Sequence, residues 1–137
     1  MILQVGVKVF LRNADGKYLI IRRSPIKYPD ARGGWDIVGG RIDVGSKLME
    51  NLRREVKEET QLKILGEPKL LYAQDIIPNS EKHVIRLSYI GETRGEPILD
   101  TSENIEYKWL PLDKLKQQGD LDVYVKEILD KGYLKKV

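Results

Sequence analysis

The sequence contains no cysteine among its 137 residues. This absence excludes disulfide bonds and metal sites built from thiolates, because both need cysteine side chains. Histidine is nearly absent as well. The single one, His83, has no neighbouring partner in the sequence with which it could form a catalytic pair, so we expect it to be structural or simply exposed.

Long hydrophobic runs are also missing. Residues 1–13 place Lys8 and Arg12 around a short apolar run, which is neither a signal peptide nor long enough to span a bilayer. We therefore expect no membrane partner and a cytoplasmic location. No internal repeat, low-complexity tract or linker interrupts the chain, so its length predicts a single domain, residues 1–137, with a modest core.

Neither sign of charge dominates the composition. Lysine and arginine together number 24 against 21 aspartates and glutamates, which gives a net charge of +3. That small excess suits an anionic small molecule as partner, but it is too small to indicate a nucleic acid. The basic residues are also interleaved with acidic ones along the chain, which argues against a small basic domain that binds nucleic acid.

Apolar periodicity predicts a mixture of strands and helices. The turn at 13–16 should join the first two strands as a hairpin, and the polar loop 78–82 should join a later antiparallel pair. Residues 24–34 contain two prolines and a glycine pair, and a loop of this length is often functional. The predicted strands cover residues 4–11, 17–23, 35–38, 69–77, 83–91 and 103–110.

Three helices are expected after the glycine pair Gly39-Gly40. The main one follows Ser46, which we interpret as its N-cap, and ends near Gln61. A short helix covers 111–118, and a final helix is capped by Asp120 and stopped by Gly132. Apolar residues repeat at a spacing of three to four in this final helix and should be core: Leu121, Tyr124, Val125, Ile128 and Leu129.

The main helix carries an acidic cluster on or beside its apolar face. With 100° of rotation per residue, the apolar side chains of this helix form one arc on its surface. Glu59 falls inside this arc, Glu55 at its edge and Glu58 about 60° further round. Burying uncompensated carboxylates costs several kcal/mol, so a cation should lie on this face. Oxygen ligands alone favour Mg²⁺ or Mn²⁺. The competing interpretation is a solvated face on which basic residues pair the glutamates. The apolar arc consists of Leu48, Met49, Leu52 and Val56.

Residues 39–62, GGRIDVGSKLMENLRREVKEETQL, also resemble the Nudix box. Two positions depart from the box. Ser46 occupies the position of its first glutamate, and Gln61 occupies the position of its late glycine. Upstream, Trp35 and the glycine pair resemble the W-x-(apolar)-P-G-G segment of the family, with Val38 in place of proline. The positions in register are Gly40, Arg54, Glu55, Val56, Glu58, Glu59 and Leu62.

The resemblance implies an α/β (α+β) fold, the Nudix α/β/α sandwich, with a mixed, partly parallel sheet between the box helix and the C-terminal helix. It also implies Mg²⁺-dependent hydrolysis of a pyrophosphate linkage. Glu55, Glu58 and Glu59 would hold the metal with the Gly39 carbonyl, and Arg54 would orient a glutamate. Either Glu55 or Glu103 would act as general base, although Glu103 could equally be a solvated loop residue.

The substrate implied is a nucleoside diphosphate linked to another moiety. A nucleoside triphosphate or an oxidised nucleotide is favoured, while nucleotide sugars, ADP-ribose and dinucleoside polyphosphates stay open. Arg22 and Arg23 could bind phosphates and Trp35 could stack on a base, although aromatic residues are more often core. The departures at Ser46 and Gln61 leave a second function open, a Nudix-like protein that binds a nucleotide without cleaving it. Family members are often dimers, so a homodimer is also left open.

Overall fold

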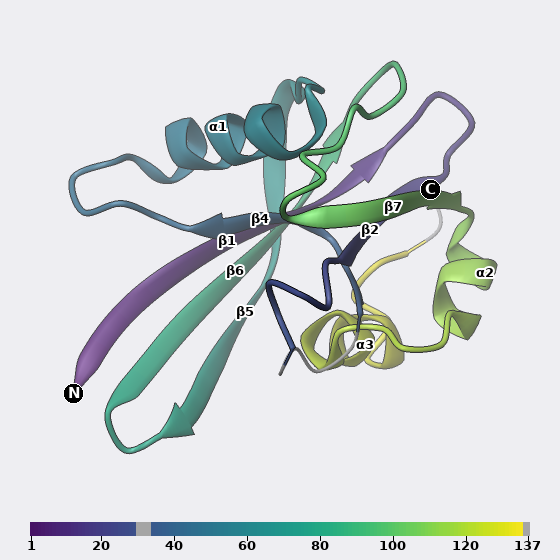
Figure 1. Cartoon of the computed structure of the whole chain (residues 1–137). Helices are drawn as coiled ribbons and strands as arrows, with labels where there is room; N and C mark the ends of the chain where they lie inside the picture. Colours follow the sequence, from purple (N-terminus) through teal and green to yellow (C-terminus); the bar gives the residue numbers. More distant parts are fainter. Residues whose placement is uncertain (30–33, 136–137) are drawn as a thin grey trace.

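A computed structural model of the chain describes residues 1–29 and 34–135 (Figure 1). Part of the predicted loop 24–34, residues 30–33, lies outside the described residues. The strands and helices in chain order are β1 (Ile2–Arg12), β2 (Tyr18–Arg23), β3 (Trp35–Asp36), β4 (Val38–Arg41), α1 (Leu48–Thr60), β5 (Leu65–Asn79), β6 (Lys82–Glu92), β7 (Asn104–Leu110), α2 (Leu112–Gln117) and α3 (Val123–Asp130).

The strands form one seven-stranded sheet in the order β3-β2-β1-β6-β5, with β4 paired to β1 and β7 paired to β2. β1 and β6 are parallel along their whole length, from Ile2 opposite Lys82 to Arg12 opposite Glu92. The other pairs are antiparallel, including the hairpin β1–β2 and the pair β5–β6. The predicted mixed, partly parallel sheet is therefore confirmed.

Helices cover both faces of this sheet, as Figure 1 shows. Alternate residues of β1 point to opposite sides, so Val7 packs with Val56 of α1 while Phe10 packs with Val125 of α3. All four side chains are fully buried, and each contributes about 1.5–3 kcal/mol by leaving water. The two cores on either side of the sheet confirm the α/β/α sandwich.

The helix α1 ends in a left-handed residue. Gln61 has φ 62° and ψ 8°, and its N–H donates to the carbonyl of Lys57. The buried Thr60 hydroxyl donates to the Val56 carbonyl and accepts from the Leu62 N–H, which fixes the chain around this turn. The left-handed conformation costs a residue with a Cβ about 1 kcal/mol relative to glycine.

Replacing Gln61 with glycine should therefore raise the free energy of unfolding by about 1 kcal/mol, because glycine adopts this conformation without a Cβ penalty. Urea unfolding monitored by circular dichroism measures the change. Gln61→Ala is the matched control, since it removes the side chain but keeps the Cβ. A glycine variant no more stable than the alanine variant would show that the left-handed backbone is not the cause.

Two predicted helix caps are wrong. The N-cap of α1 is Lys47, without a side-chain cap bond, because the first bond of the helix runs from the Asn51 N–H to the Lys47 carbonyl at 2.9 Å. α3 is capped by Asp122 rather than Asp120. The reason is a backbone link between Trp35 and residues 120–122: the Trp35 N–H donates to the Asp120 carbonyl at 2.9 Å, so the helix begins later.

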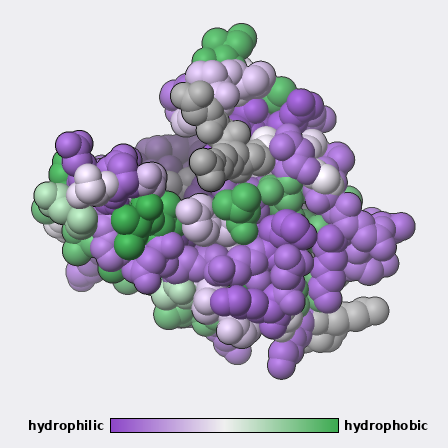
Figure 2. All heavy atoms as spheres, turned by 90° about the horizontal axis from the view of Figure 1, so that it is seen from below, coloured by the Kyte–Doolittle hydropathy of each residue, from purple (hydrophilic) through white to green (hydrophobic). Residues whose placement is uncertain are grey.

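The described residues include no helix that is both long enough and apolar enough to cross a membrane. On the face shown in Figure 2, hydrophilic side chains predominate, and hydrophobic ones form small groups separated by hydrophilic residues. His83 lies on β6, with its Nε2 atom 2.7 Å from an oxygen of the largely exposed Asp75. This contact links the neighbouring strands β5 and β6.

Candidate functional site

The glycine pair of β4 lies against the acidic face of α1. The Gly39 N–H donates to Glu59 Oε2 at 3.1 Å, which draws this carboxylate over the strand. Gly39 has φ 145°, and a Cβ there would lie 2.0 Å from the Val7 carbonyl oxygen. A Cβ on Gly40 would lie 2.9 Å from Glu55 Oε2. Gly39 is therefore needed for β4 to pair this closely with β1, and Gly40 leaves room for the Glu55 carboxylate of α1.

Glu59 and Glu55 share a site in which negative charge is poorly compensated. The pKa of Glu59 is raised to about 7. Burial is the largest cause, and the negative charge of the nearby Glu55 acts in the same direction. Lys8, the Gly39 N–H and the Asn104 amide act in the opposite direction without cancelling these effects. Burial also raises the pKa of Glu55. Two carboxylates destabilised in this way form a site that a cation would stabilise.

Glu58 and Arg54 lie on the outer side of α1. The Glu58 side chain is 56% exposed and pairs with Arg54, whose Nη1 lies 3.1 Å from Oε1. Arg54 also contacts Asp43 at 2.9 Å and approaches Glu55 at 3.7 Å. In the part of the chain that the structure describes, no three acidic or histidine side chains converge as a metal site. The structure thus brings together Glu55 and Glu59 but leaves Glu58 at the rim.

Glu103 faces the same site from the loop before β7. It accepts hydrogen bonds from Lys27 Nζ and from the Tyr28 hydroxyl, and its carbonyl accepts from the Ser24 N–H at 2.8 Å. The bond from Lys27, followed by that from Tyr28, lowers the pKa of Glu103. Burial and the bond to Glu103 raise the pKa of Tyr28 to about 12. Glu103 therefore holds the segment 24–28 beside the site.

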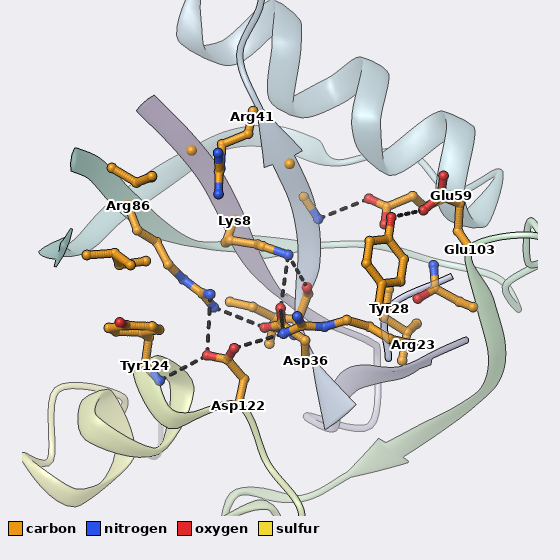
Figure 3. A pocket seen from close by; sticks show the side chains of 18 residues that line it. Lys8, Arg23, Tyr28, Asp36, Arg41, Glu59, Arg86, Glu103, Asp122 and Tyr124 are labelled. Carbon is orange, nitrogen blue, oxygen red and sulfur yellow. Dashed lines mark hydrogen bonds and ion pairs between the residues drawn. The ribbon is translucent and has the colours of Figure 1, made fainter. Parts of the chain in front are cut away.

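A cavity of about 420 Å³ extends from these carboxylates toward the N-terminus of α3 (Figure 3). This volume is in the usual range for small-molecule sites. Glu59, Glu103 and Tyr28 line its acidic end, near α1. Four basic side chains line the remainder of the cavity, namely Lys8, Arg23, Arg41 and Arg86.

The basic end is organised by two buried aspartates (Figure 3). Asp36 pairs with Lys8 at 3.1 Å, with Arg23 at 2.7 Å and with Arg86 at 3.0 Å. Asp122 pairs with Arg23 at 2.8 Å and with Arg86 at 3.3 Å. Burial alone would raise the pKa of Asp36, but Lys8, Arg86 and Arg23 hold this pKa well below its usual value. The network therefore stays charged at neutral pH.

The candidate substrate-binding residues are distributed unevenly. Arg23 lines the cavity, whereas Arg22 is on the outer side of β2 and pairs with the exposed Glu106 at 2.8 Å. Trp35 packs in the core against α2 and α3, with Lys108 Nζ 4.7 Å from its ring centre. The structure thus places Trp35 in the core, away from the cavity. Tyr124, predicted as core, instead lines the cavity.

Sequence reasoning missed most of the charged and polar side chains that line the cavity. A signal for Arg86 was present, because it alternates with the buried Val84 and Ser88 along β6 and so occupies an inward position. Asp36 likewise interrupts a run of buried residues between Trp35 and Val38. A charged residue at an inward position points to a buried partner. The missed residues are Lys8, Asp36, Arg41, Arg86, Asn104 and Asp122.

Comparisons of sequence identify relatives. The chain is 27% identical over 110 residues to a Bacillus subtilis protein named as a candidate 8-oxo-dGTP diphosphatase, a match covering 80% of this chain and 68% of that protein. It is 35% identical over 86 residues to the nucleoside triphosphatase NudI of Salmonella agona, covering 61% of this chain and 54% of NudI. The match thus spans only about half the length of NudI.

Solved structures share the whole fold. The MutT protein from Methanosarcina mazei superposes with a TM-score of 0.78 at 28% identity, covering 94% of this chain and 91% of that one. A MutT NUDIX hydrolase from Burkholderia pseudomallei gives 0.78 at 24% identity, covering 95% and 98%. The model of the NUDIX domain matches residues 2–131 of the sequence. The chain therefore belongs to the NUDIX domain family, which confirms the Nudix hydrolase resemblance of its glycine pair and acidic helix.

Proposed function

We propose that the protein hydrolyses a phosphoric anhydride bond of a nucleoside triphosphate or an oxidised nucleotide, with Mg²⁺ as cofactor. The names of its relatives, an 8-oxo-dGTP diphosphatase and a nucleoside triphosphatase, support this substrate class. The observation that carries the proposal is the half-buried pair of carboxylates, Glu59 and Glu55, next to the glycines of β4. Mn²⁺ would fit the same oxygen ligands.

The donor set fits a hard divalent ion. Glu59 would hold the metal together with the Gly39 carbonyl, and Glu58 would join them by leaving Arg54. Glu55 would either bind the ion as well or act instead as general base. When bound, the ion neutralises phosphate oxygens and lowers the pKa of coordinated water. Arg54 keeps Glu58 and Glu55 close to this position through its contacts at 3.1 and 3.7 Å. Arg23 and Lys8 supply positive charge toward the substrate.

Glu55 suits the role of general base better than Glu103. A base needs a free oxygen and a pKa that is not depressed. Glu103 accepts from Lys27 and Tyr28, which lowers its pKa, while burial raises the pKa of Glu55. We therefore expect Glu55→Gln to lower kcat by about a hundredfold or more, and Glu103→Gln by about tenfold at most.

Steady-state kinetics of the two variants, under saturating Mg²⁺, measure this difference. Each variant replaces a glutamate with its neutral isostere, so the two act as matched controls for each other. Circular dichroism confirms that both are folded. A larger loss in Glu103→Gln than in Glu55→Gln would reverse the assignment.

A substrate panel tests the proposed function itself. The panel contains the four deoxynucleoside triphosphates, 8-oxo-dGTP, ADP-ribose, a nucleotide sugar and a dinucleoside polyphosphate, each with Mg²⁺ or with EDTA. Chromatography of the products measures pyrophosphate or phosphate together with the nucleotide released. We expect Mg²⁺-dependent cleavage of a triphosphate. Absence of Mg²⁺-dependent product from every compound would contradict the proposal.

A second candidate function, nucleotide binding without cleavage, is favoured by two observations. Ser46 supplies no carboxylate at the start of α1, and Glu58 is paired with Arg54. Such a protein would bind nucleotides in calorimetry with Mg²⁺ while releasing no product. The homodimer and the cytoplasmic location stay predictions that gel filtration and cell fractionation would test.

A further inference from the structure

The two aspartates at the basic end of the cavity have little free hydrogen-bonding capacity toward a ligand. Asp36 Oδ1 accepts from the Ile37 N–H at 2.7 Å and from Arg86 at 3.0 Å, while Oδ2 accepts from Arg23 at 2.7 Å and from Lys8 at 3.1 Å. Each carboxylate oxygen thus has two donors, which matches its two lone-pair sites.

Asp122 is engaged in the same way. Its Oδ1 accepts from the Tyr124 and Val125 N–H groups at 2.9 and 3.2 Å and lies 3.3 Å from Arg86 Nη1. Its Oδ2 accepts from Arg23 at 2.8 Å. Protein donors therefore occupy both sites on three of the four carboxylate oxygens, and Asp122 Oδ2, with one donor, keeps a single acceptor site.

Donors, by contrast, remain available. Arg86 is only 5% exposed, and its buried Nε–H has no hydrogen-bond partner within residues 1–29 and 34–135. Leaving such a buried donor unpaired costs about 1–3 kcal/mol, so a bound partner would be favourable. Arg41 also lines the cavity, donating to Gln4, and no acidic side chain of the described residues lies within ion-pair distance of it. Three cations, Lys8, Arg23 and Arg86, face two aspartates here.

We propose that this end of the cavity is a subsite for the carbonyl-bearing edge of the nucleobase, so that the enzyme prefers keto bases to amino bases. The proposal rests on the proposed function, which directs the phosphates toward Glu55 and Glu59. Guanine presents two neighbouring acceptors, O6 and N7, which arginine binds in a bidentate manner. Adenine places an amino donor where guanine has O6, and cytosine has one where uracil has O4.

The Tyr124 ring gives the base an apolar neighbour. It lines the cavity together with Arg86, whose guanidinium lies over the ring, 5.8 Å from its centre. A base edge that meets Arg86 would then lie beside an aromatic surface. Arg86 is accordingly the residue that we expect to determine specificity, with Arg41 contributing.

Matched substrate pairs test the proposal on the full chain. With Mg²⁺, kcat/KM is compared for dGTP against dATP and for dUTP against dCTP, and the affinities for dGMP and dAMP are measured by calorimetry. We expect the keto member of each pair to be favoured by about tenfold or more. Equal values within both pairs and equal affinities for the two monophosphates would overturn the proposal.

Two variants connect the preference to the arginines. Arg86→Lys keeps the charge but removes Nε and the planar fork, and should reduce both keto-to-amino ratios to near one. Arg41→Met should reduce the ratios by a smaller factor, and it keeps the test valid if Arg86→Lys does not fold. The exposed Arg94, which does not line the cavity, provides the control variant Arg94→Met. Ratios unchanged in Arg41→Met and in a folded Arg86→Lys would overturn the assignment.

Failure of the proposed function gives a different result. If no nucleotide is cleaved but dGMP still binds more tightly than dAMP, the subsite stands and the hydrolase assignment does not. The other case is that cleavage is observed, that the two members of each substrate pair react equally well, and that a nucleotide sugar reacts faster than any triphosphate. The hydrolase assignment then stands, and the cavity accommodates a moiety other than a keto base.

Discussion

Replacing Glu59 with glutamine should lower kcat/KM for the best nucleotide substrate by about a hundredfold to a thousandfold at saturating Mg²⁺. Glu59 is the carboxylate most deeply placed at the glycine pair, held by the Gly39 N–H at 3.1 Å. Glutamine preserves its shape and can still accept that bond, but it removes the negative charge that would hold the metal. The loss should therefore appear mainly in catalysis, and steady-state kinetics across a range of Mg²⁺ concentrations measure it.

The same variant should be more stable than the wild type when no metal is present. At neutral pH the fold destabilises the ionised form of Glu59, because burial and Glu55 raise its pKa to about 7, and the amide removes this cost. Mg²⁺ should raise the melting temperature of the wild type more than that of the variant. Glu50→Gln, in the exposed first turn of the same helix, is the matched control. A Glu59→Gln protein with full activity would refute the metal assignment.

Replacing Asp36 with asparagine should lower the free energy of unfolding by about 3–5 kcal/mol at pH 7. Asparagine cannot balance Lys8, Arg23 and Arg86, which would stay close together with little access to water. Urea unfolding measures the effect. Asp130→Asn removes a carboxylate from an exposed pair with Lys126 and should change stability little, so it serves as the control.

The pH dependence of stability provides a second test of Asp36. Its folded pKa lies below the unfolded value, so the folded state favours the ionised form. The stabilisation is therefore complete above the unfolded pKa of about 4 and is lost as the pH falls below it. The advantage of the wild type over Asp36→Asn in urea unfolding should be constant from pH 7 to about pH 5 and should begin to fall between about pH 4 and pH 3, because the folded pKa lies lower still. An advantage that stays constant over this range would contradict the buried ion-pair network.

Local patterns predicted much of the fold. Alternation located the strands, and the 100° period ordered the three glutamates of α1 as the structure has them, with Glu59 innermost and Glu58 most exposed. Strand ends were less accurate: β5 begins at Leu65 rather than at residue 69, because its antiparallel pairing with β6 continues past Pro68. Pairing between strands, which a local pattern does not contain, decides such boundaries.

The ionic half of the cavity could not be predicted because its residues are far apart in the sequence. Arg86 meets Asp36 across 50 positions, and Arg23 meets Asp122 across 99. Their meeting depends on the parallel pairing of β1 with β6, which places Arg86 opposite Gly6. Gly6 has no side chain to fill the space in front of the arginine. Helix periodicity alone also assigned Tyr124 to the core, because it could not show that the first turn of α3 borders a cavity.

Asp122 serves two purposes with the same two oxygens. It starts α3 by accepting from the Tyr124 and Val125 N–H groups, and it holds Arg23 and Arg86 at the cavity. The anchoring of the C-terminal helix and the electrostatic character of the pocket therefore cannot vary independently. A redesign of this enzyme toward another base would have to provide a new start for that helix before it could alter the charge at this position.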